Sequence, residues 1–157
     1  RFIRPKITLD DLILKFILSA LLYAPELIAE YEEQTAMFDI KNARLKIMLE
    51  MIFNISRTTD PITPETLVKQ LEQNGFEREL QNLWELQMLR QQKPYPQKLR
   101  EEIDTKIAEV QLNQLENEIK ECLRILQTSE SFSEETYNRY EMLKKEKNSL
   151  LNTHTAI

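Results

Sequence analysis

Side chains that commonly carry out catalysis are scarce in this sequence and lie apart from one another. Its 157 residues contain one histidine, His154, and one cysteine, Cys122. We interpret His154 as a solvated residue of the C-terminal tail. Cys122 is interpreted as a small buried side chain, because no histidine or basic cluster adjoins the thiol to activate it as a nucleophile. One cysteine also excludes an internal disulfide and a zinc site built from several cysteines.

The acidic residues favour neither a metal site nor a pair of catalytic carboxylates. Asp10–Asp11 and Glu32–Glu33 are adjacent pairs. Neighbours on a helix point about 100° apart, so these acids are interpreted as helix caps and solvated charge. The single glycine, Gly75, cannot make the glycine-rich loops that bind phosphate in P-loop and Rossmann proteins. We therefore expect no catalytic residue, no metal ligand and no cofactor-binding residue in this chain.

Basic residues near the C-terminal end are the remaining candidates for phosphate contacts. Lys144, Lys145 and Lys147 lie close together, but Glu141 and Glu146 interleave with them. This arrangement favours a mixed, solvated helix face. The formal net charge of −5 argues against nonspecific binding to nucleic acid or to anionic membranes, and we expect direct contact with neither.

The composition favours an all-α fold. One glycine and six prolines in 157 residues are typical of a helical protein, because sheets need glycine-rich turns. The most apolar run, Leu12–Ala24, is too short to span a membrane. Residues 1–7 are predicted to be a linker remnant from a longer protein, because the start is basic, contains Pro5 and lacks Met. The single cysteine suits a reducing cytoplasm.

Residues 8–95 carry the signals of five helices. They run from a cap at Thr8 or Asp10 to Tyr23, from Pro25 onward, over about residues 41–56, from the Thr63 cap to Asn74–Gly75, and from Phe76 past Met88. Residues 35–40 are predicted to be a loop or short turn. In the fifth helix, apolar residues recur at helical spacing, so Trp84 and Met88 are predicted to be core residues rather than parts of a cofactor site.

One long helix is predicted over about residues 98–128, because this stretch contains neither Pro nor Gly; it would be about 45 Å long. Its apolar residues form two successive stripes, which are Leu99, Ile103, Ile107 and Val110, then Leu112, Leu115, Ile119, Cys122 and Leu126. The second stripe lies well over 90° around the helix from the first. We therefore predict a helical bundle over residues 8–111, joined through the long helix to a helical hairpin over residues 112–151, with a flexible tail at 152–157.

The last helix is the best candidate for a binding surface. Ser133 is predicted to cap it, and Phe132 to pack on Tyr137 as a hydrophobic staple. Tyr140, Leu143 and Leu150 project inward. Tyrosine and methionine among charged residues on an exposed helix are typical of protein-binding sites. The candidate binding residues are Tyr137, Glu141, Met142, Lys144, Lys145, Asn148 and Leu151, together with Arg124 from the long helix. Packing of Tyr137 and Leu151 on the turn and the tail remains an open alternative.

Four short motifs follow one another in a characteristic order. They are Leu21-Leu22-x-x-Pro25-Glu26-Leu27, Ile62-Thr63-x-x-x-Leu67, Glu121-x-Leu123-x-x-Leu126 and Phe132-Ser133-x-Glu135. In their order and spacing the chain resembles the C-terminal helicase-binding domain of bacterial DNA primase. The resemblance extends from about Leu12 to Leu151, and the regions 32–41 and 94–96 have no counterpart in it.

The resemblance implies a noncatalytic domain, monomeric on its own, that docks on the N-terminal domains of the hexameric replicative DNA helicase. Such a domain couples RNA primer synthesis to the replication fork in the bacterial cytoplasm. The zinc-binding and polymerase domains of primase would lie upstream. The same bundle architecture also resembles the N-terminal domain of the replicative helicase itself, so a helical self-association module is the alternative. A helical enzyme that uses scattered carboxylates is a third hypothesis, which the shortage of histidine disfavours.

Overall fold

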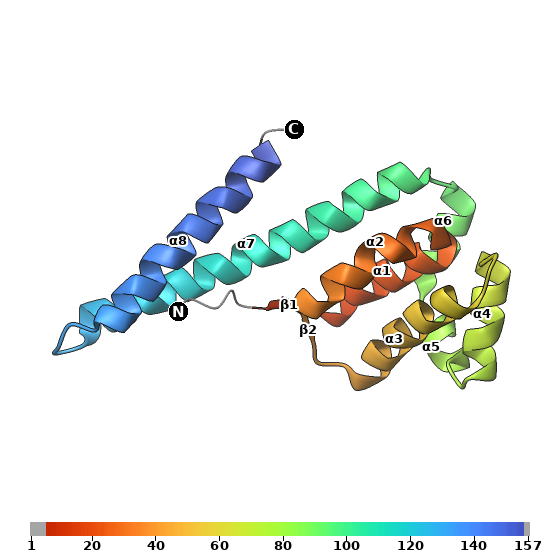
Figure 1. The fold of residues 1–157 in the computed structure, drawn as a ribbon, viewed down its shortest axis with the longest axis horizontal. Coiled ribbons are helices and arrows are strands. Elements are labelled where there is room, and N and C mark those ends of the chain that lie inside the picture. The colour runs from red at the N-terminus through yellow and green to blue at the C-terminus, as the bar shows by residue number, and fades with distance from the viewer. Residues whose placement is uncertain (1–5, 156–157) are drawn as a thin grey trace. The chain divides into compact units, whose positions relative to one another are not determined.

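The computed structural model describes residues 6–155, and the side chains of residues 6–153 (Figure 1). The side chain of His154 therefore lies outside the described part. In chain order the elements are β1 (Ile7–Leu9), α1 (Asp11–Tyr23), η1 (Pro25–Leu27), α2 (Ile28–Glu32), η2 (Glu33–Met37), β2 (Phe38–Ile40), α3 (Ala43–Thr58), α4 (Pro64–Gln73), α5 (Glu77–Gln81), α6 (Trp84–Gln92), α7 (Pro96–Thr128) and α8 (Glu134–Thr155). The predicted all-α fold is confirmed, and β1 and β2 add only a small two-stranded sheet.

The chain divides into two compact units. Among the described residues, the bundle unit comprises residues 9–106, and the hairpin unit comprises residues 107–155 together with residues 6–8. The 33-residue helix α7 contributes its first turns to one unit and its remaining turns to the other. The predicted boundary between residues 111 and 112 lies in the same helix, a few residues further along.

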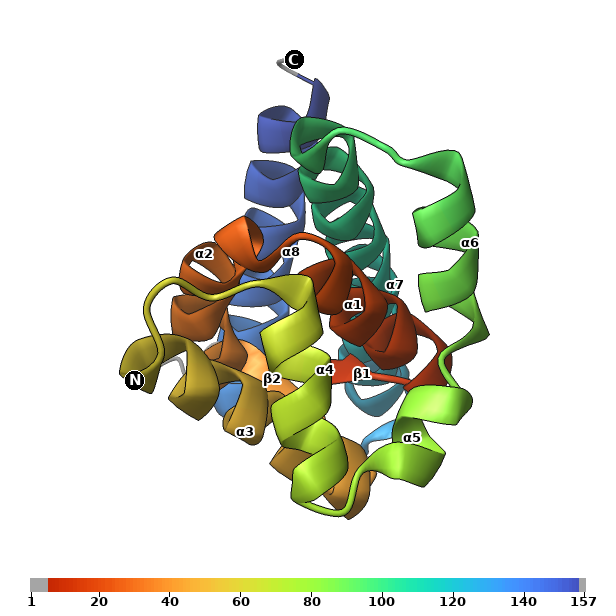
Figure 2. The same cartoon turned by 90° about the vertical axis from the view of Figure 1, so that its right-hand side faces the viewer.

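Helix α1 is the central helix of the bundle unit. It begins at Asp10, whose Oδ1 accepts a hydrogen bond from the Ile13 backbone N–H at 2.9 Å. Its buried residues face several sides, and the helix packs against α3, α4 and α6 (Figure 2). Over residues 6–155 no single helix has the length and apolar composition to cross a membrane; α1 and the segment Pro25–Met37 meet these criteria only together, across a bend of 112°.

Helix α4 begins and ends where its sequence predicts. Thr63 caps its start through a hydrogen bond from the Thr66 N–H, with Pro64 in the first turn. At its end, Gly75 adopts a φ of 87°, which an L side chain rarely allows. The Phe76 N–H then donates to the Leu71 carbonyl at 3.0 Å. This is the helix end that a glycine after the last turn predicts.

The predicted fifth helix is two helices, and this corrects the assignment of two side chains. The chain turns at Asn82–Leu83, which separates α5 from α6. After the turn, Leu86 and Leu89 are buried, whereas Trp84 is 58% exposed and Met88 is 41% exposed. The prediction that Trp84 and Met88 are core residues was wrong, because the turn rotates α6 and directs its other face inward.

The ends of the chain and the segment before α3 contain more regular structure than predicted. Residues 38–40 form β2, which pairs with β1, rather than a loop. Ile7, predicted as linker, begins β1, and residues 1–5 of that predicted linker lie outside the described residues. Helix α8 continues to Thr155, past the tail boundary predicted at residue 152, because no Pro or Gly follows Leu151 to end it.

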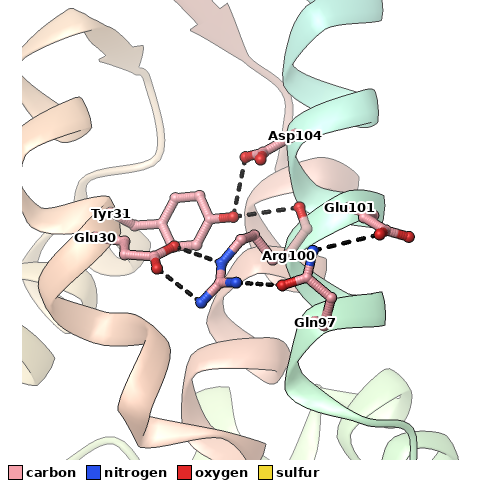
Figure 3. Close-up of polar contacts among 6 residues, drawn as sticks. All are labelled: Glu30, Tyr31, Gln97, Arg100, Glu101 and Asp104. Carbon is pink, nitrogen blue, oxygen red and sulfur yellow. Dashed lines mark hydrogen bonds and ion pairs between the residues drawn. The ribbon is translucent and has the colours of Figure 1, made fainter. Parts of the chain in front are cut away.

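Polar side chains hold the first turns of α7 to α2 within the bundle unit (Figure 3). Arg100 of α7 donates to both carboxylate oxygens of Glu30, with Nε–Oε2 at 2.8 Å and Nη2–Oε1 at 2.7 Å. On the same side of α7, Leu99 and Ile103 are buried. Leu99 and Ile103, the first two residues of the first apolar stripe, therefore belong to the bundle unit, whereas Ile107 and Val110 of the same stripe belong to the hairpin unit.

Candidate protein-binding surface on the helical hairpin

The hairpin is held together by a small apolar core between α7 and α8. Leu115, Cys122 and Leu143 are buried there. Three partly buried side chains pack against this cluster, those of Ile119, Tyr140 and Leu150. The inward positions predicted for α8 are thus confirmed, as are those of Leu115, Ile119 and Cys122 in the second stripe of α7. Leu112 and Leu126 of that stripe are half-buried and lie outside this cluster. Burial raises the pKa of the Cys122 thiol, which lowers its thiolate fraction and agrees with a packing role.

Two ion pairs at the edges of this core connect the helices. Arg139 Nη2 lies 3.4 Å from Glu118 Oε2, and Lys147 Nζ lies 3.6 Å from Glu116 Oε1. The charged groups are partly exposed, so each pair adds little stability. Because both pairs join α8 to α7, they help to set which face of α8 turns outward.

The start of α8 has the predicted cap and staple. The Thr136 N–H donates to Ser133 Oγ at 3.2 Å. The Phe132 ring centroid lies 5.8 Å from that of Tyr137, within the range of favourable aromatic pairs. The staple leaves Phe132 72% exposed.

Five of the candidate residues form one outward strip, the α8 flank, which consists of Tyr137, Glu141, Lys144, Asn148 and Leu151. They follow one another at intervals of four and three residues, so they lie along one side of the helix. Four of the five are exposed, and Glu141 is half-buried. Tyr137 is 42% exposed and Leu151 is 37% exposed, so both offer apolar surface at opposite ends of the flank.

Aromatic contacts connect the flank to the hairpin core. The ring centroids of Tyr137 and Tyr140 are 6.5 Å apart, and Lys144 Nζ lies 4.9 Å from the centroid of Tyr140. Both distances fit favourable contacts. A line of three rings therefore runs from Phe132 through Tyr137 to the partly buried Tyr140 and ends at the Lys144 ammonium group.

The other three candidates lie away from this line. Met142 is half-buried and Lys145 is exposed. Arg124 on α7 pairs with Glu121 of the same helix, with Nη2–Oε1 at 2.6 Å, and this hydrogen bond lowers the pKa of the Glu121 carboxyl. The structure therefore groups the α8 flank but leaves Arg124 engaged within its own helix.

Sequence reasoning assigned Phe132 a local role only. A residue immediately before a Ser cap predicts a staple, and the structure confirms the contact with Tyr137. It does not predict how much of the ring stays in water, because that depends on whether any other element covers the turn. Phe132 is therefore an addition to the candidate surface.

The bundle unit contains a second, less specific candidate for a binding site. A hollow of about 500 Å³ is lined by α4, α5 and α6, with Val68, Leu80, Leu86 and Arg90 among its lining residues. Among the residues that the structure describes, no group of three or more His, Cys, Asp or Glu side chains is placed to hold a metal ion.

Comparisons of the chain with protein-family models, with curated proteins and with solved structures find no match.

Proposed function

We propose that this chain is a noncatalytic protein-interaction domain of a bacterial DNA primase, and that it docks on the N-terminal domains of the hexameric replicative DNA helicase. In this role it couples RNA primer synthesis to the replication fork in the bacterial cytoplasm. The observation that carries the proposal is the hairpin, in which a line of aromatic rings runs from the exposed Phe132 and Tyr137 to the partly buried Tyr140, beside charged side chains.

The positions of the sequence motifs support the proposal. Pro25 begins η1 directly after α1, Thr63 caps α4, and Phe132–Ser133 opens α8. Three of the four motifs that resemble the primase domain thus coincide with the start of a helix, and the fourth, Glu121–Leu126, lies in the last turns of α7. A resemblance that depends on order and spacing is stronger when its motifs occur at such structural boundaries.

The chemistry of the α8 flank suits a protein partner. Tyrosine supplies a large contact area and loses little conformational entropy when it is fixed, which makes it common among residues that dominate binding energy. Lys144 and Asn148 lie beside the rings and are exposed, as is usual for the polar rim of an interface. Mixed charges on this helix fit an ordered protein surface better than the uniform phosphates of nucleic acid.

Binding to the isolated helicase tests the proposal directly. The full chain would be mixed with the hexameric replicative helicase of the same bacterium, and the mixture analysed by size-exclusion chromatography with light scattering. We expect a monomer when the chain is alone and a stable complex with the hexamer. Absence of a complex at concentrations of tens of micromolar would contradict the proposal.

Self-association is the alternative function, and the exposed apolar ends of the α8 flank at Tyr137 and Leu151 favour it. In that case the hairpin would pair with a second copy of itself. Sedimentation of the chain alone over a hundredfold range of concentration distinguishes the two functions. A stable dimer that does not bind the helicase would support self-association and exclude the docking role.

A further inference from the structure

The turn between α7 and α8 is the most exposed apolar feature of the hairpin unit. We call residues 127–138 the hairpin tip. Phe132 is 72% exposed, and among the residues that the structure describes its ring contacts one other aromatic ring, that of Tyr137. Covering an apolar ring that is left largely in water favours binding in proportion to the area that a partner covers. The tip is thus a favourable position for an anchoring residue.

The charges around Phe132 all have one sign. The tip contains Glu130, Glu134 and Glu135 and has no Lys, Arg or His. All three carboxylates are exposed, and none forms an ion pair within the part of the chain that the structure describes. The nearby cations are engaged elsewhere, since Arg124 pairs with Glu121 and Arg139 pairs with Glu118.

Local helix stability accounts for two of these carboxylates but not for the third. Glu134 and Glu135 lie in the first turn of α8, where the positive end of the helix dipole stabilises them. Glu130 lies just beyond the C-terminal end of α7 at Thr128, where the negative end of that dipole disfavours a carboxylate. The dipole of α7 therefore does not favour a carboxylate at residue 130.

From these observations, and resting on the proposed function, we infer that the hairpin tip inserts Phe132 into an apolar pocket of the helicase N-terminal domain whose rim carries Lys or Arg side chains. Glu130, Glu134 and Glu135 would face that basic rim. Complementary charges around a central aromatic anchor increase the rate of association and fix orientation, while burial of the ring slows dissociation. The α8 flank would then add contacts beside this anchor.

Substitution of the anchor gives the first test. Phe132→Ala should weaken binding to the helicase hexamer at least tenfold, mainly through faster dissociation. Tyr95→Ala is the matched control, because Tyr95 is 83% exposed, outside the hairpin, and joins α6 to α7. Binding kinetics would be measured by biolayer interferometry, and thermal unfolding by circular dichroism would show that both variants fold.

Charge reversal at Glu130 gives a second test that does not depend on loss of stability. Glu130→Lys places a cation at the C-terminal end of α7, which should preserve or strengthen the hairpin. It should nevertheless slow association severalfold at 50 mM salt, with a smaller effect at 500 mM salt, because salt screens exposed charges. Glu50→Lys on α3 is the control, since it makes the same charge change at another exposed position.

The outcomes separate this inference from the proposed function. If the unmodified chain fails to bind the helicase, both are overturned. If the chain binds but Phe132→Ala and Glu130→Lys behave like their controls, docking stands and the inferred role of the tip is overturned. Weaker binding by Phe132→Ala and slower, salt-dependent association by Glu130→Lys would together support it.

Discussion

The hydroxyl group of Tyr31 donates a hydrogen bond to Asp104 Oδ1 at 3.0 Å, which connects α2 to α7 within the bundle unit (Figure 3). The same oxygen lies 3.3 Å from the Arg100 carbonyl oxygen. Tyr31 is 1% exposed. Burial raises the pKa of its phenol well above the ordinary value, and the hydrogen bond and negative charge of Asp104 raise it further.

Removal of this hydroxyl group should destabilise the bundle unit modestly. Tyr31→Phe keeps the buried ring but loses the hydrogen bond to Asp104, which should lower the free energy of unfolding by about 1 kcal/mol at pH 7. Urea unfolding followed by circular dichroism measures the change. Tyr23→Phe is the matched control, because the Tyr23 hydroxyl has only a long contact of 3.4 Å with the Pro94 carbonyl. An equal loss in both variants would contradict a specific role for Asp104.

The stability advantage of Tyr31 over Phe should also depend on pH. Because the folded state raises the pKa of this phenol, the unfolded chain loses its proton first, near pH 10. The contribution of the Tyr31 hydroxyl group to the free energy of unfolding is therefore complete below pH 10 and decreases as the pH rises above 10. Urea unfolding at pH 7, 9 and 11 should show the difference between the wild type and Tyr31→Phe shrinking only at the highest pH. A difference that stays constant up to pH 11 would contradict this assignment.

Elements with strong local signals were predictable from the sequence, and elements that depend on distant partners were not. Thr63 marks the start of α4 because its side chain caps the helix, and Gly75 marks the end because its backbone adopts a positive φ. The break between α5 and α6 lacks such a signal, since the sequence at Asn82–Leu83 contains neither Pro nor Gly. Apolar spacing permits one helix with Trp84 inward or two helices with Leu86 inward, and packing against α1 selects the second.

The attachment of the N-terminal strand to the hairpin unit was also beyond sequence reasoning. Gln114 of α7 accepts a hydrogen bond from the Thr8 N–H at 2.9 Å and donates one to the Lys6 carbonyl. A single glutamine amide thus satisfies two backbone groups more than a hundred residues away, and no local pattern predicts that. The candidate surface could be predicted more readily from the sequence, because helical periodicity alone places the α8 flank outward.

The cap of α8 should contribute measurably to the stability of the hairpin. Ser133→Ala removes the hydrogen bond from the Thr136 N–H to Ser133 Oγ, so the free energy of unfolding should fall by about 1 kcal/mol. Ser131→Ala is the control, because this exposed serine uses only its backbone carbonyl, as the acceptor for Ser129 Oγ. Thermal unfolding of both variants measures the difference, and an unchanged melting temperature for Ser133→Ala would contradict the role of the cap.

Neighbouring tyrosines on α8 should have separable effects on folding and binding. Tyr140 packs against the hairpin core, so Tyr140→Ala should lower stability, by up to about 3 kcal/mol. Tyr137 is 42% exposed, so Tyr137→Ala should largely preserve folding and weaken binding to the helicase by about 1–2 kcal/mol. Calorimetry and binding titrations on the same preparations test both effects, and the opposite pattern would contradict the assignment of helix faces.

The buried thiol of Cys122 should report on the integrity of the hairpin core. Cys122 is 5% exposed and shares its cluster with Leu143, which is 0% exposed. Leu143→Ala leaves a cavity and should cost about 2–5 kcal/mol, so Cys122 should become accessible more often through local opening. Its reaction with an aromatic disulfide reagent should therefore be slow in the folded wild type and much faster in Leu143→Ala. Met142→Ala, a change at the adjacent half-buried residue, should leave the rate close to that of the wild type. Equal rates in the wild type and Leu143→Ala would show that these two side chains do not share one core.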